Sequence, residues 1–196
     1  KPDFTEGALA ILSGVQARKR LLLQPKMNGF AWNKLYRLST IRNHGLRFLD
    51  DTGTTEDLDF AYRYLAYAER ICHAPALRTY HYYQRTGAAT PSGFSHKKMG
   101  SLHTYKKIID DSATWCPELK AAAEEELCVT AVNLLWTWEM GDRTDRMARR
   151  MLLQSIRRYL PSHLCSRRYG IGRKLQALTA AIFPRLFTWL KNSAKK

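Results

Sequence analysis

The chain has 196 residues, of which 45% are hydrophobic and 11% aromatic, and this composition excludes a disordered chain. Its net charge of +15 is uneven: residues 141–196 hold 14 Lys+Arg and 2 Asp+Glu, so the basic character belongs to the C-terminal tail. The four cysteines form no C-x-x-C pair, which disfavours zinc and thioredoxin-type chemistry. We expect Cys72, Cys116, Cys128 and Cys165 to be reduced, buried small side chains.

The first predicted elements lead toward a Trp-containing motif. Residues 1–15 predict a helix, and a second helix-like run extends from Trp32 to His44. Gly45 can adopt the left-handed conformation that ends a helix, after which residues 46–49 predict a short strand. The chain then turns at residues 50–53, which are Asp, Asp, Thr and Gly.

From Thr54 or Thr55 a further helix is predicted by apolar residues at helical spacing, with Asp59 mostly off the apolar face. That face comprises Leu58, Ala61, Tyr62, Leu65 and Ala68. The helix begins beside an acidic pair, Glu56-Asp57.

Two interpretations of this acidic pair stay open. Thr54-x-x-Asp57 matches a capping box, and acidic residues in a first turn are favoured by the helix dipole by about 0.3–1 kcal/mol. The same N–H groups and dipole also keep Asp57 ionised near neutral pH, as a general base must be. The pattern alone does not separate the two.

Short strands are predicted at residues 70–73 and 77–83, followed by a loop over residues 84–93. Two longer helices follow at residues 94–112 and 117–139. The second should direct its apolar side chains inward and turn Glu124 to Glu126 toward water or a basic neighbour. The inward set is Leu127, Ala131, Leu134, Leu135 and Trp138.

The tail predicts basic amphipathic helices interrupted at Pro184. The predicted apolar stripes are Met147, Met151, Leu152, Ile156 and Tyr159, and then Leu175, Leu178, Ile182, Leu186 and Trp189. Such helices suit an anionic membrane surface, and they equally suit packing of the apolar face on the rest of the protein. No apolar run is long enough to cross a bilayer.

Several motifs in order resemble the second half of family 2 glycosyltransferases, specifically the bacterial non-processive enzymes that build surface polysaccharides. They are WNKLY at residues 32–36, LRF at 46–48, TEDLDF at 55–60 and YHYY at 80–83. The resemblance implies an α/β, helix-rich fold: the C-terminal half of a GT-A-type domain with short strands over residues 1–115, followed by an all-helical extension over residues 116–196.

The resemblance also implies roles for individual residues. Asp57 would be the general base of an inverting transfer, with Glu56 orienting the acceptor or the turn. Substrate contacts would come from Trp32, Lys34, Thr55, His81 and Arg85. Trp32 could instead be a core residue and Lys34 a solvated helix flank, while His81 and Arg85 could be an ordinary strand side chain and a solvated loop cation.

The family's nucleotide-binding half and its aspartate-rich metal motif have no counterpart in the sequence, so we expect a C-terminal fragment that is inactive alone. The resemblance implies a nucleotide-sugar donor, a glycan or lipid-linked acceptor, and Mg or Mn whose main ligands lie outside this chain. The expected location is cytoplasmic, peripheral at the inner face of the cytoplasmic membrane. The alternative is a basic helical nucleic-acid-binding or adaptor module without catalysis, supported by net charge and interleaved aromatic residues.

Overall fold

A computed structural model describes residues 9–23, 27–77, 80, 81, 83, 93–141 and 143–193. The described chain is helix-rich, with a single two-stranded antiparallel sheet among these residues. It forms two compact units: residues 1–50 with 55–90, and residues 51–54 with 91–196. They are called the N-terminal unit and the helical unit below.

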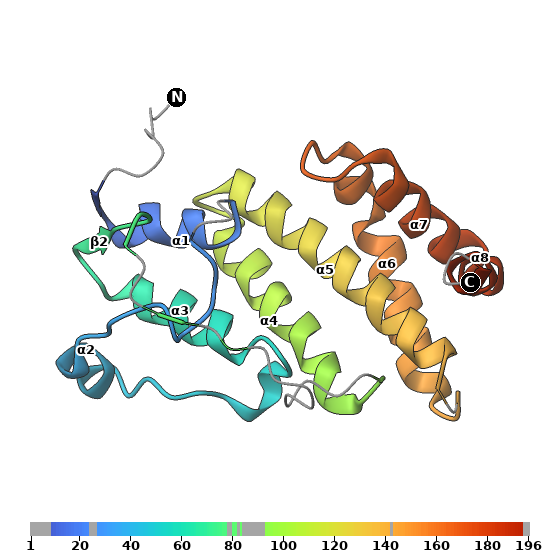
Figure 1. Cartoon of the computed structure of the whole chain (residues 1–196), viewed down its shortest axis with the longest axis horizontal. Helices are drawn as coiled ribbons and strands as arrows, with labels where there is room; N and C mark the ends of the chain where they lie inside the picture. Colours follow the sequence, from blue (N-terminus) through green and yellow to red (C-terminus); the bar gives the residue numbers. More distant parts are fainter. Residues whose placement is uncertain are drawn as a thin grey trace. The chain divides into compact units, whose positions relative to one another are not determined.

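In the N-terminal unit, strand β1 (Ala10–Leu12) pairs with β2 (Ile71–His73), with Ile11 opposite Cys72. Helix α1 (Gly14–Leu23) packs against α3 (Glu56–Ala66), and the short helix α2 (Leu38–Asn43) lies between them in sequence (Figure 1). The predicted apolar face of α3 is confirmed, since Leu58, Ala61, Tyr62 and Leu65 are all buried.

The end of α2 confirms the prediction made for Gly45, whose φ is +58°. The Gly45 N–H donates to the carbonyl of Arg42, and the Leu46 N–H donates to the carbonyl of Ile41. This pair of bonds is the Schellman arrangement, in which a left-handed residue satisfies the last carbonyls of a helix. The helix therefore ends where the glycine predicted it would.

Several elements of this unit differ from the predictions. The expected N-terminal helix begins only at Gly14, since residues 10–12 are a strand paired with β2. The run from Trp32 is helical only from Leu38, because residues 28–34 form a loop held by the Lys34 ammonium.

The predicted strand at 46–49 is absent, and the carbonyl of Arg47 instead accepts a hydrogen bond from Arg63 at 2.6 Å. In the predicted strand at 77–83, the described residues 77, 80, 81 and 83 belong to no strand. The short strand at residues 70–73 is confirmed in β2.

The helical unit consists of α4 (His96–Ser112), α5 (Pro117–Glu139), α6 (Arg146–Cys165), α7 (Ile171–Ile182) and α8 (Pro184–Ser193). Helix α5 packs on both α4 and α6, and α7 packs on α6 and α8 (Figure 1). All five inward residues predicted for α5 are buried. Glu125 and Glu126 meet the predicted basic neighbour, Arg168, at 3.2 and 2.7 Å.

The tail divides into a packed and an exposed part. Leu152, Ile156 and Tyr159 of α6 are buried as predicted, but Met147 and Met151 are exposed, because the buried face of α6 is centred on Leu152 and Ile156. The helix break at Pro184 is confirmed.

The second predicted stripe is mostly exposed, because α7 packs through its small residues. The buried residues of α7 are Ala177, Ala180 and Ala181, and α8 buries Phe187. Exposed members of the stripe are Leu175, Ile182, Leu186 and Trp189.

The unit boundary differs from the predicted division at residue 115. Helix α4 belongs to the helical unit because it packs along α5. All four cysteines are free, but only Cys116 and Cys128 are buried, whereas Cys72 and Cys165 are exposed. Over the described ranges, no helix combines the length and apolar character needed to span a bilayer.

Candidate functional site

The acidic pair occupies the first turn of α3, with Glu56 exposed and Asp57 half-buried. Thr55 is the N-cap, and its side chain makes no capping bond. The Thr54 hydroxyl lies 3.1 Å from the hydroxyl of Ser101, so its described partner is not the helix end. A Thr54–Asp57 capping box therefore does not account for the acidic residue at position 57.

The loop at residues 27–34 lies directly on this first turn. Gly29 has no room for a side chain, because a Cβ there would lie 2.7–2.9 Å from atoms of Leu58. Met27 at the start of the loop is buried. The close backbone approach that glycine permits brings the WNKLY motif onto the helix that carries Asp57.

Lys34 holds this loop together. Its ammonium donates to the carbonyls of Asn28 and Phe30 at 2.6 and 2.7 Å, and to Oδ1 of Asn33 at 2.6 Å. An ammonium has three N–H groups, so all three are committed to chain oxygens. Burial lowers the pKa of Lys34 to about 8, an effect opposed by the negative charge of Asp57.

This electrostatic pairing predicts how Lys34 titrates. Because Asp57 stabilises the charged ammonium, Asp57→Asn should move the pKa of Lys34 further below about 8. NMR of protein labelled at lysine Cε measures the titration, and Glu56→Gln, at the exposed neighbour, should leave it unchanged. A Lys34 midpoint near the ordinary value of about 10.4, or one indifferent to Asp57→Asn, would contradict the arrangement.

Tyr36 is the second residue whose pKa responds to the charge of Asp57. Burial, and then the charges of Asp57 and Tyr64, raise the pKa of its phenol. Its ring packs edge-on against Phe60 and Tyr64, at centroid distances of 5.3 and 4.8 Å. Its hydroxyl is buried and has no hydrogen-bond partner among the described residues.

An unsatisfied buried hydroxyl costs about 1–3 kcal/mol. The sequence contained Tyr36 within the WNKLY motif, but no local pattern distinguished it from a core aromatic residue.

Three aromatic rings from two distant segments form a stack. Trp32 lies against Phe30 at 5.2 Å and against Tyr80 at 4.6 Å, with interplanar angles of 18° and 25°. Phe30 and Tyr80 are each about half exposed, at 49% and 51%, and Trp32 is 36% exposed. Accessible ring surface is therefore offered by Phe30 and Tyr80 as well as by Trp32, and flat aromatic surface is suited to the apolar face of a sugar ring.

The other acidic residue of the TEDLDF motif has a structural role. Asp59 is buried, in contrast to its predicted position off the apolar face, and its Oδ2 accepts from Nε of Arg63 at 2.8 Å. Because Arg63 also holds the Arg47 carbonyl, this pair fixes residues 46–49 to α3. The ion pair with Arg63 offsets the free-energy cost of burying the Asp59 carboxylate.

Lys34 and Tyr36 thus lie within electrostatic reach of Asp57, and the Trp32 ring stacks on Tyr80. His81 is exposed and lies outside any helix or strand. The predicted contact at Arg85 lies outside the described residues.

In the part of the chain that is described, no three His, Cys, Asp or Glu side chains gather into a group that could hold a metal ion. Comparison of the chain with protein-family models, with curated proteins and with solved structures gives no match.

Proposed function

We propose that the N-terminal unit is the acceptor side of a GT-A-type inverting glycosyltransferase, with Asp57 as the general base. The observation that carries the proposal is that Asp57, in the first turn of α3, acts electrostatically on Lys34 and Tyr36, beside a loop whose Trp32 ring stacks on Phe30 and Tyr80. Ordered motifs that resemble family 2 glycosyltransferases supply the reaction class.

In the proposed reaction, an acceptor hydroxyl attacks the anomeric carbon of a nucleotide-activated sugar. The new C–O bond forms as the bond to the nucleoside diphosphate breaks, and the hydroxyl proton passes to the Asp57 carboxylate. A single displacement of this kind inverts the anomeric configuration. The exposed rings of Tyr80 and Phe30 support the sugar face.

Lys34 has a positioning role in this proposal, because its three donors already hold the loop that bears Trp32. Glu56 and Thr55 border the acceptor, and His81 and Arg85 remain proposed contacts. The donor and the divalent ion that the resemblance implies are assigned to a nucleotide-binding half of the enzyme. The acceptor is a glycan or a lipid-linked sugar of a bacterial surface polysaccharide.

Attachment to the inner face of the cytoplasmic membrane is part of the proposal. Large apolar side chains are exposed on α7, on α8 and at the residue between them, in the basic tail: Leu175, Ile182, Phe183, Leu186 and Trp189. Aromatic and aliphatic side chains enter the interface, and basic residues are attracted to anionic lipid.

Substitution of Tyr80 by alanine tests the acceptor site. We expect the KM for acceptor to rise about three- to tenfold, because a ring contact of this kind contributes about 0.5–1.5 kcal/mol, while the KM for donor stays constant. Initial rates in the longest natural protein that contains this sequence measure both constants. Tyr83→Ala, at an exposed residue of the same segment, is the control. An equal rise in both KM values would refute acceptor stacking.

A further inference from the structure

Six arginines line one cavity of the helical unit, which has a volume of about 670 Å³. Trp138, Leu153 and Gln154 complete its wall, and none of its lining residues carries a carboxylate. The arginines are Arg143, Arg146, Arg149, Arg150, Arg157 and Arg185.

Neighbouring groups neutralise this charge only in part. Buried Glu139 pairs with Arg149 at 2.9 Å and with Arg143 at 3.8 Å. Arg157 donates to the carbonyl of Ala181 at 3.0 Å. The remaining three arginines have no carboxylate partner among the described residues. Several guanidinium groups this close repel one another, so a bound anion would stabilise the cavity.

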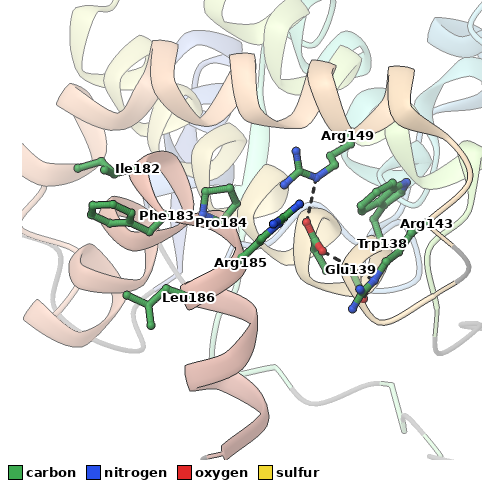
Figure 2. Close-up of a pocket in the computed structure, with 9 residues that line it drawn as sticks. All are labelled: Trp138, Glu139, Arg143, Arg149, Ile182, Phe183, Pro184, Arg185 and Leu186. Carbon is green, nitrogen blue, oxygen red and sulfur yellow. Dashed lines mark hydrogen bonds and ion pairs between the residues drawn. The ribbon is translucent and has the colours of Figure 1, made fainter.

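A second hollow, of about 590 Å³, adjoins the first and shares Trp138, Arg143, Arg149 and Arg185 with it. The carboxylate of Glu139, which pairs with Arg149, also lines this second hollow. Figure 2 shows Arg185 extending from the start of α8 toward Glu139 and Arg149. On the other side of Pro184 lie Ile182, Phe183 and Leu186, which are 55%, 60% and 45% exposed. Cationic and apolar surfaces therefore meet within one depression.

We propose that this depression binds an anionic lipid that carries a phosphate monoester or diphosphate head. The head meets the arginines, whose planar forks bind phosphate oxygens in pairs. The lipid chain lies on Ile182, Phe183 and Leu186, which would otherwise expose apolar surface to water. Phe183 offers one ring on which a base can stack, but the aliphatic side chains of Ile182 and Leu186 beside it suit a lipid chain better than nucleic-acid bases.

This site goes beyond sugar transfer and stands independently of it, because every residue involved belongs to the helical unit and the test measures binding. Diffuse attraction to a membrane would depend on total charge. A head-group site depends on which arginines are present and on the chemistry of the phosphate, and this difference provides the test.

Flotation with vesicles of phosphatidylcholine containing phosphatidic acid measures the affinity, with phosphatidylglycerol vesicles of matched surface potential for comparison. We expect tighter binding to phosphatidic acid. The double substitution Arg150→Gln and Arg185→Gln should weaken that binding about 25-fold, since each arginine that contacts the phosphate contributes about fivefold. The matched control, Arg158→Gln with Arg167→Gln, removes the same charge from tail residues outside the cavity. It should weaken binding to phosphatidic acid by less than a third of the factor expected for the cavity variant. Thermal unfolding confirms that both variants are folded.

Equal losses of affinity in the two double variants would overturn a specific site. Equal affinity of the unsubstituted protein for phosphatidic acid and phosphatidylglycerol vesicles would do the same. Two further titrations identify the source of the phosphate. Inorganic diphosphate should bind at least tenfold more weakly than phosphatidic acid vesicles, because it lacks the chain. Diphosphate or single-stranded RNA binding as tightly as the vesicles would overturn the lipid assignment.

Discussion

Asp57→Asn should lower the rate of sugar transfer about 10²–10⁴-fold, because the amide cannot accept the proton of the acceptor hydroxyl. The substitution is nearly isosteric at a half-buried position of the first turn of α3. Its expected effect on stability is small, about 0.3–1 kcal/mol from the lost interaction with the helix dipole. Transfer assays on the longest natural protein that contains this sequence, together with thermal unfolding, measure the two effects separately.

Glu56→Gln is the matched control for this substitution, since it makes the same chemical change at the adjacent, exposed residue. We expect it to lower the transfer rate much less than Asp57→Asn does, because Glu56 borders the acceptor but does not take its proton. Donor binding should also be unchanged by Asp57→Asn, because the carboxylate acts on the acceptor. An active Asp57→Asn protein would eliminate the proposed base, and an unfolded one would assign Asp57 to the structure of the helix end.

Leu152→Ala should lower the free energy of unfolding of the helical unit by about 2–5 kcal/mol, the cost of a cavity left by a fully buried leucine. Leu152 is 0% exposed on α6, the helix that packs along α5. Urea denaturation followed by circular dichroism measures the change.

The adjacent residue supplies the control, because Met151 is 49% exposed on the same helix. Met151→Ala should change the free energy of unfolding by no more than about 0.5 kcal/mol. The sequence pattern placed both side chains on one apolar stripe, whereas the structure buries Leu152 and exposes Met151. Similar losses for the two substitutions would support the sequence pattern over the structure.

The features that were predicted correctly depend on local chemistry. Gly45 ends α2 because its own conformation allows it, and Pro184 separates α7 from α8 because proline has no N–H to continue a helix. Helix α5 has the predicted bounds and buried residues because its apolar spacing repeats over many turns.

The features that were missed depend on contacts between distant segments. Strand β1 exists because it pairs with β2, and the Trp32 ring meets Tyr80 from a segment far along the chain. Nothing in the WNKLY motif indicates that Lys34 will fold back onto the carbonyls of Asn28 and Phe30. The candidate site is therefore a predicted acid, Asp57, surrounded by neighbours that only the fold reveals.

The most direct test of Asp57 as base compares acceptors whose attacking hydroxyl differs in acidity, such as a sugar acceptor and its analogue with fluorine beside that hydroxyl. A more acidic hydroxyl needs less help from a base. The ratio of wild-type to Asp57→Asn transfer rates should therefore fall as the hydroxyl becomes more acidic. A ratio that stays constant across the series would show that Asp57 takes no part in removing the proton.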